Sequence, residues 1–106
     1  MIKGDILLVP FPFSDLTGSK TRPALILAVK DSDIIVAFIS TQLHRKEEDD
    51  IYLKPNVDNG LKKDSFVRLT KVATLDKELA LGRIGTVNSE TIRQVNSSLR
   101  KILQID

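Results

Sequence analysis

The sequence predicts a mainly β domain with a C-terminal helix, built as a small barrel of five or six short strands. Two continuous apolar runs, residues 24–29 and 34–39, are joined by a few polar residues, which is typical of a β-hairpin. An amphipathic segment with helical spacing closes the chain. With 106 residues, the chain has the length of one domain, so we assign residues 1–106 to a single domain.

Three strands are expected in the first half of the chain. Residues 5–9 are rich in Ile and Leu, and the prolines in residues 10–13 are expected to end that strand because proline cannot donate to a β ladder. Residues 14–21 contain Asp, Gly and Ser and predict a turn-rich loop. The two apolar runs then pair around the polar turn at residues 31–33.

The second half predicts shorter elements. Residues 51–53 form a candidate short strand, and residues 66–72 alternate as a strand does. A helical turn fits residues 74–81, and residues 84–87 form the last strand. Because both runs of the hairpin are apolar at every position, both faces of the sheet need cover, from a helix or from another subunit.

The C-terminal helix is expected to begin at Asn88 or Ser89, whose side chains can accept a backbone hydrogen bond. Glu90 in the first turn, and Arg100 and Lys101 in the last, suit the helix dipole. The apolar face consists of Ile92, Val95, Leu99 and Ile102. Their spacing of three and four residues predicts packing of this face against the sheet.

The composition excludes several kinds of site. The 16 basic and 14 acidic side chains give a net charge of +2, and residues 47–50 are all acidic. That cluster is either a solvated loop amid ordinary surface charge, or it lies apart from a basic groove for an anionic strand. The absence of cysteine excludes disulfides and thiolate metal sites, and a single histidine excludes a metal site built from several histidines. We expect no metal and no cofactor. Without a signal peptide or an apolar run of about 18 residues, we expect a cytoplasmic protein outside the membrane.

One group of polar residues suits a phosphate ligand. Arg22 precedes the first run of the hairpin and residues 40–42 follow the second, so pairing of the runs places Arg22 opposite Thr41. An arginine fork beside hydroxyl donors matches the oxygens of a phosphate. The alternative is structural: Arg22 caps the sheet edge or pairs with Asp15, and Ser40 and Thr41 merely end a strand.

Short motifs in a fixed order are more specific than this group alone. They are GDILLVPFPFSDL at residues 4–16, RPALIL at 22–27, ISTQ at 39–42, FVRL at 66–69, ATLD at 73–76 and IGTV at 84–87. With the final helix, they cover nearly the whole chain. In these motifs the sequence resembles the MazF/PemK-like toxins of type II toxin–antitoxin systems.

The resemblance implies an SH3-like β-barrel that works as a homodimer. It implies a sequence-specific, metal-independent endoribonuclease that cuts single-stranded RNA and so inhibits translation and growth. It also implies a cognate antitoxin whose disordered tail covers the RNA groove, with DNA met only through that antitoxin. The family's essential arginine falls on Arg22 and its strand-end hydroxyl on Ser40, with Thr41 as a second catalytic candidate.

The sequence departs from one branch of the family. In that branch an Arg-x-Asp pair carries acid–base roles. Arg68 matches the arginine, but Thr70 stands where that branch has the aspartate, so the general base is unassigned. Histidine is a common general base in enzymes, so His44, the one histidine of the chain, is either this base or an exposed loop residue.

RNA binding is expected from aromatic, amide and basic side chains. Phe11 and Phe13 either stack on unpaired bases or pack the loop of residues 10–21 onto the barrel. Basic side chains contact backbone phosphates. The candidates are Phe11, Phe13, Lys20, Gln42, Arg45, Lys46 and Arg68.

The expected chemistry is transphosphorylation, in which the ribose 2′-OH attacks the adjacent phosphorus and leaves a 2′,3′-cyclic phosphate and a 5′-OH. Since the substrate supplies the nucleophile, no cysteine is needed. Two rivals remain open. One is a non-catalytic toxin that binds DNA gyrase, as the CcdB toxins do, although the C-terminal tryptophan of that group is missing here. The other is a degenerate relative that binds RNA without cutting it.

Overall fold

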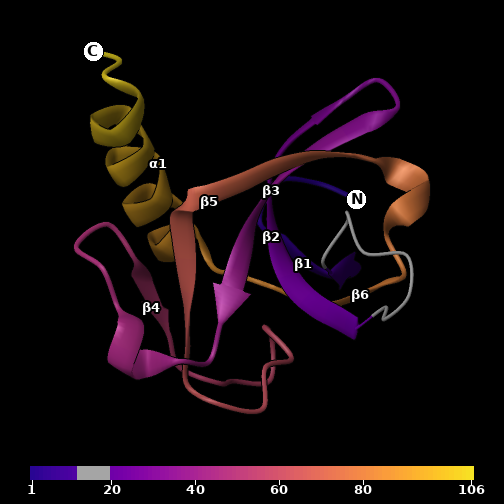
Figure 1. The fold of residues 1–106 in the computed structure, drawn as a ribbon, viewed down its shortest axis with the longest axis horizontal. Coiled ribbons are helices and arrows are strands. Elements are labelled where there is room, and N and C mark those ends of the chain that lie inside the picture. Colours follow the sequence, from indigo (N-terminus) through magenta and orange to yellow (C-terminus); the bar gives the residue numbers. More distant parts are fainter. Residues whose placement is uncertain (12–19) are drawn as a thin grey trace.

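A computed structural model describes residues 1–11 and 20–106. Figure 1 shows the strands and helices in chain order. The strands are β1 (Asp5–Phe11), β2 (Lys20–Lys30), β3 (Asp33–Ser40), β4 (Ile51–Leu53), β5 (Ser65–Asp76) and β6 (Gly82–Thr86). The helices are η1 (Leu43–Arg45), η2 (Lys77–Leu79) and α1 (Ser89–Leu103).

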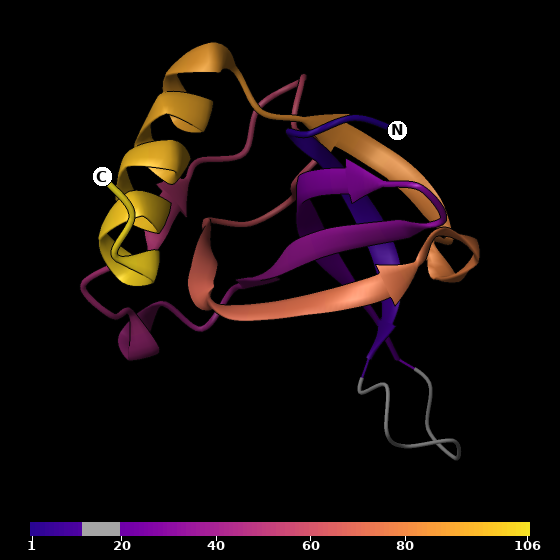
Figure 2. The ribbon, with the colours of Figure 1, turned by 90° about the horizontal axis from the view of Figure 1, so that it is seen from above.

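All six strands join one antiparallel sheet in the order β4-β5-β3-β2-β1-β6. The sheet curls strongly, and α1 lies along one side of it next to β4 (Figure 2). In the described part of the chain, β4 and β6 remain the two edges, so the predicted barrel is observed as a half-barrel. The predicted fold class, mainly β with a C-terminal helix, is confirmed.

Both faces of the sheet are covered, as the doubly apolar strands require. On one face, Leu25, Ala37 and Val67 share a buried cluster with Val95 of α1. On the other face, Ile26 belongs to a second cluster, which the curl of the sheet closes around itself. Burial of this kind stabilises at roughly 25 cal/mol per Å² of apolar surface removed from water. Successive side chains of one apolar strand point to opposite faces of the sheet, so this small chain builds an apolar layer on each face.

The helix follows its predicted pattern. The Asn88 side chain accepts a hydrogen bond from the Thr91 N–H at 2.9 Å, which caps the first turn. Gln104, with φ of +58°, ends the helix in the left-handed conformation. Val95 is fully buried under the sheet. No helix in residues 1–11 and 20–106 is long and apolar enough to cross a membrane.

The register of the central hairpin corrects one expectation. Val29 pairs with Ile34 as predicted, but the ladder shifts between Ile26 and Ala28. Beyond this bulge, the ladder ends at the pair of Ala24 and Phe38. The register at this end of the hairpin therefore differs by one residue from the predicted one, because the β-bulge adds one residue to one strand.

Two strand boundaries also differ from the predictions. β1 does not end at Val9 but runs through Pro10 to Phe11, and Pro10 pairs with Thr21. The pairing of β1 with β6 stops at Leu8, so Pro10 has no strand neighbour on that side among the described residues, and its missing N–H costs no bond of this ladder. Because Phe11 at the end of β1 pairs with Lys20, β2 begins already at Lys20, inside the predicted loop.

β5 is the longest strand and the most bent. It extends to Asp76, where a helical turn was expected, because its pairing with β3 continues to Asp33. Only Lys77–Leu79 form a 3-10 turn. Between the pairs Phe38–Arg68 and Ala37–Val72, three residues of β5 have no partner on β3. β5 turns a sharp corner along its length (Figure 1), and residues near this bend line the groove described next.

Candidate functional site

A groove of about 960 Å³ opens where β3 ends and β5 bends. Its lining comes from four places in the sequence: the start of β2, the end of β3, the loop after β3, and the bend of β5. The described lining residues are 22–23, 38–42, Arg45, Glu47, Arg68 and 70–72. The groove therefore depends on the curl of the sheet and the bulges of its strands.

Positive charge dominates this groove. Among the described lining residues, the basic side chains are Arg22, Arg45, Arg68 and Lys71, and the acidic one is Glu47. Serine, threonine and glutamine side chains lie between them. A concave surface with this excess of positive charge raises the local concentration of anions. The net charge of +2 for the whole chain conceals this local excess.

Arg22 is presented to solvent by β2, where it pairs with Val9 of β1. In the described part of the chain its guanidinium has no ion pair and no side-chain hydrogen bond. The structural alternative, a pair with Asp15, concerns a residue outside the described ranges. Since no described residue uses them, the five N–H donors of the Arg22 guanidinium remain available to bind an anion.

Ser40 stands at the last position of β3, half-buried in the groove. Its hydroxyl oxygen accepts a hydrogen bond from the Gln42 N–H at 3.1 Å. Because a hydroxyl also has one hydrogen to donate, Ser40 can give that hydrogen to a ligand. Thr41 and Gln42 line the same groove and are exposed. The structure thus brings Arg22 and residues 40–42 to one place, as the hairpin predicted.

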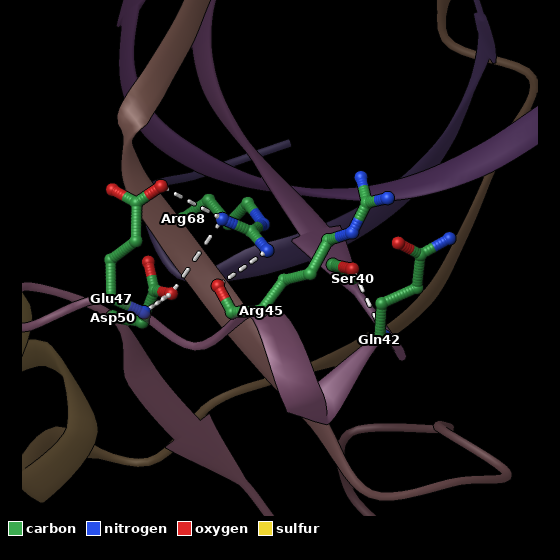
Figure 3. Close-up of polar contacts among 6 residues, drawn as sticks. All are labelled: Ser40, Gln42, Arg45, Glu47, Asp50 and Arg68. Atoms are coloured by element: carbon green, nitrogen blue, oxygen red, sulfur yellow. Dashed lines mark hydrogen bonds and ion pairs between the residues drawn. The ribbon is translucent and has the colours of Figure 1, made fainter.

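Arg68 differs from Arg22 because its guanidinium is surrounded by protein (Figure 3). Its Nη1 lies 3.4 Å from Glu47 Oε1 and 3.8 Å from Asp50 Oδ2, and its Nη2 donates to the Arg45 carbonyl oxygen at 2.9 Å. The guanidinium also stacks 4.9 Å from the centre of the Phe66 ring. We call Arg68, Glu47, Asp50 and the Arg45 carbonyl the Arg68 cluster.

The side chain of Arg45 points away from that cluster. Figure 3 shows its guanidinium extended toward Ser40, whereas Glu47 lies on the far side of Arg68. Within the described residues, the Arg45 guanidinium forms no ion pair. Arg45 and Arg22 are therefore the two guanidinium groups that the described groove leaves open to a ligand.

Other sequence candidates lie elsewhere. Lys20 and Lys46 are exposed but do not line the groove, and neither does His44, which is exposed on η1. Phe11 lies on β1 opposite Lys20, and its side chain is outside the described part of the structure. Phe13 falls outside the described residues altogether. Among residues 1–11 and 20–106, no three His, Asp or Glu side chains lie close enough together to hold a metal ion.

The sequence interpretation missed two features of this site. The acidic residues 47–50 were treated as a group, yet the Asp50 side chain is 1% exposed while that of Glu47 is 56% exposed. The position of Asp50 directly before the apolar strand at Ile51 is the signal that could have indicated its burial. Lys71 was missed because the bend that turns it into the groove has no local signature.

No curated protein sequence matches the chain at a significant level. Residues 2–103 match the family described as PemK-like, MazF-like toxin of type II toxin–antitoxin system.

Solved structures share the fold at low sequence identity. The Mycobacterium tuberculosis toxin MazF-mt6 matches with a TM-score of 0.78 and 20% identity, covering 96% of this chain and 98% of that one. An endoribonuclease from a mycobacterial species, in complex with its cognate antitoxin, matches with a TM-score of 0.76 and 17% identity, covering 100% and 95%. MazE–MazF from Deinococcus radiodurans matches with a TM-score of 0.78 and 14% identity, covering 100% and 97%.

Proposed function

The chain belongs to the PemK-like, MazF-like toxins of type II toxin–antitoxin systems, and from this premise we propose that it is a metal-independent endoribonuclease that cuts single-stranded RNA. One observation carries the proposal beyond family membership. Within the described residues, Arg22 has no ion pair and Ser40 keeps a hydroxyl hydrogen to donate, and both line a groove with excess positive charge. This is a set of donors suited to a phosphodiester.

The reaction is transphosphorylation. The 2′-oxygen of a ribose forms a bond to the adjacent phosphorus, and the bond from phosphorus to the 5′-oxygen breaks. The 2′-OH proton passes to a base and the leaving 5′-oxygen acquires a proton, so the products are a 2′,3′-cyclic phosphate and a 5′-OH. The nucleophile belongs to the substrate, so the protein needs to supply only positioning and charge stabilisation.

Arg22 and Ser40 are the catalytic residues in this proposal, with Thr41 beside them. As the phosphorane forms, its equatorial oxygens gain negative charge, which the Arg22 guanidinium and the Ser40 hydroxyl stabilise. A preorganised donor of this kind contributes roughly 3–4 kcal/mol to transition-state stabilisation. Holding the strand so that the 2′-oxygen attacks in line with the leaving oxygen contributes several kcal/mol more.

The remaining parts of the proposal concern partners. We propose that the chain works as a homodimer in the cytoplasm, cuts mRNA at specific sequences and thereby inhibits translation and growth. A cognate antitoxin binds the toxin and covers the groove, and DNA is met only through that antitoxin. Two structurally similar proteins were solved with such a partner, the mycobacterial endoribonuclease and the Deinococcus MazE–MazF.

The test incubates purified protein with a long single-stranded RNA, and separately with its all-DNA counterpart, in excess EDTA. Arg22→Ala is assayed beside Arg93→Ala, a control that removes the same charge from an exposed position on α1. We expect wild type and Arg93→Ala to cut RNA at a few sites and to leave DNA intact, and Arg22→Ala to leave both intact.

Four other results would contradict the proposal. Cleavage that EDTA abolishes would argue against metal independence, and cleavage of DNA would argue against 2′-OH chemistry. RNA that stays whole, with folded protein bound to it, would favour a degenerate RNA-binding relative. Neither binding nor cleavage, together with altered supercoiling by DNA gyrase, would favour the gyrase-directed toxin.

A further inference from the structure

We propose that Arg68 is a positioning residue, which holds the loop after β3 so that Arg45 meets an RNA phosphate, and that Asp50 and Glu47 are its partners in this task. The inference rests on the proposed function for the identity of the ligand. Its structural basis is the Arg68 cluster, in which one guanidinium joins a strand of the sheet to three positions of a single loop.

Among the described residues, the loop has few other contacts with the sheet. Its helical turn, η1, contains no buried residue, and Leu43 in that turn is 45% exposed and belongs to neither buried cluster. Its own backbone bonds are local, from Arg45 N–H to the Gln42 carbonyl at 3.0 Å and from Lys46 N–H to the Leu43 carbonyl at 3.2 Å. Local bonds of this kind shape a turn but do not fix its position against the sheet. Arg68 supplies that fixed point.

Arg68 is well suited to be a fixed point. It lies on β5, an interior strand, where it pairs with Phe38 of β3, and the preceding residue Val67 pairs with Ile51 of β4. Its side chain is 13% exposed and stacks on the buried Phe66 ring. Asp50 completes the arrangement, because its carboxylate also accepts a hydrogen bond from the Glu47 N–H at 2.7 Å and so closes the loop upon itself.

Charge compensation separates Arg68 from a phosphate ligand. Two carboxylates lie within 4 Å of its guanidinium, and the more exposed of them, Glu47, lines the groove where a phosphate would approach. An anion drawn to Arg68 would meet Glu47 first. Arg45 has the opposite arrangement: its carbonyl is held by Arg68, while its guanidinium extends on the Ser40 side of Arg68 (Figure 3) and forms no ion pair within the described residues.

The two possible roles of Arg68 predict opposite effects for Asp50→Asn. If Arg68 binds phosphate itself, neutralising Asp50 releases a cation and removes an anion, so RNA binding tightens. If Arg68 positions Arg45, the same change loosens the loop, so binding weakens. Glu48→Gln is the matched control, because Glu48 is exposed in the same loop and outside the Arg68 cluster.

The experiment measures binding of a mixed-sequence 2′-O-methyl RNA 20-mer, which lacks the nucleophile, over a range of salt concentrations. We expect Asp50→Asn and Arg68→Met to weaken binding roughly three- to tenfold relative to Glu48→Gln and Arg93→Met. Arg45→Gln is expected to reduce the slope of log Kd against the logarithm of the salt concentration by about 0.7, which is the value for one phosphate contact on a single strand. In the Arg45→Gln background, Arg68→Met is expected to cause no further loss.

Tighter binding by Asp50→Asn, or losses from Arg45→Gln and Arg68→Met that multiply, would overturn the inference. Arg68→Lys covers the case in which Arg68→Met is unfolded, since lysine keeps the charge but cannot bridge the Arg45 carbonyl and the carboxylates together. The binding of Arg68→Lys should also be weaker than that of wild type, and wild-type affinity would contradict the positioning role.

A wild type that binds the 20-mer but never cuts RNA would overturn the nuclease proposal alone, whereas a wild type that does not bind would overturn both.

Discussion

On one side of the groove, at the start of β2, Arg22 is exposed and has no ion pair in the described part of the chain. On the other side, at the bend of β5, Arg68 is largely buried among two carboxylates, a carbonyl and an aromatic ring. The residue type, the charge and the groove are the same. What differs is the surroundings, because the first arginine keeps its donors for a ligand and the second uses them on the protein.

This difference teaches that a basic residue in a binding groove cannot be assigned a role from its charge alone. A compensated guanidinium offers little net attraction to an incoming phosphate, but it can hold a flexible loop in place. An uncompensated one is stable only where water or a ligand solvates it. The two arginines should therefore respond differently to mutation, one in activity and the other in stability.

The largest expected effect is on catalysis by Arg22. Arg22→Ala should lower kcat for RNA cleavage about 100- to 1,000-fold, the loss typical of removing one preorganised donor from a transition state. Arg22→Lys should recover only part of the loss, because an ammonium keeps the charge without the fork. Single-turnover cleavage of an end-labelled RNA measures both rates. A loss below threefold for Arg22→Ala would remove it from the catalytic residues.

The next effect concerns Ser40, on the same side as Arg22. Ser40→Ala removes the hydroxyl hydrogen and should slow cleavage about 10- to 100-fold, as expected for a hydrogen bond to a charged group. Ser40→Thr keeps the hydroxyl and should stay within a few-fold of wild type in the same assay. If Thr41→Ala slows cleavage more than Ser40→Ala does, Thr41 rather than Ser40 is the main catalytic hydroxyl.

Stability should separate the two arginines most directly. Arg68→Met places an apolar side chain beside Phe66 in place of the guanidinium, but leaves the Asp50 carboxylate without its cation, which should lower the free energy of unfolding by about 1–3 kcal/mol. Arg22→Met breaks no described contact, so it should change that free energy by less than about 0.5 kcal/mol. Urea unfolding followed by circular dichroism gives both values. Equal losses would contradict the distinction between the two sides.

The smallest effect is spectroscopic and reports on β4, behind the Arg68 side. Tyr52, the chain's only tyrosine, pairs with Phe66, and its hydrogen bond to the Asp64 carboxylate raises the pKa of the phenol above 10.0. The neutral phenol is thus favoured in the folded state, so this contribution is present below pH 10.0 and is lost as the pH rises through the raised value. Ultraviolet titration should show Asp64→Asn ionising at lower pH than wild type, and unchanged titration would exclude the hydrogen bond.

Much of the fold could be predicted because its signals are local. The hairpin, the C-terminal helix and its cap at Asn88 follow from apolar runs, spacing and polar residues that lie within a few positions of one another. The gathering of Arg22 and Ser40 also follows, since both flank the same hairpin. Family membership follows from short motifs such as RPALIL and ISTQ, which keep their order along the chain.

Only the tertiary structure decided the details on which the site depends. It shifted the register at the Arg22 end of the hairpin by one residue, bent β5 so that Lys71 enters the groove, and buried Asp50 beside Arg68. The bend of β5 and the burial of Asp50 result from packing between segments far apart in sequence, and the register shift results from a bulge that the apolar pattern of the hairpin does not show. Sequence periodicity records which face of a strand is apolar, but the partner that compensates a charge is chosen when the chain folds.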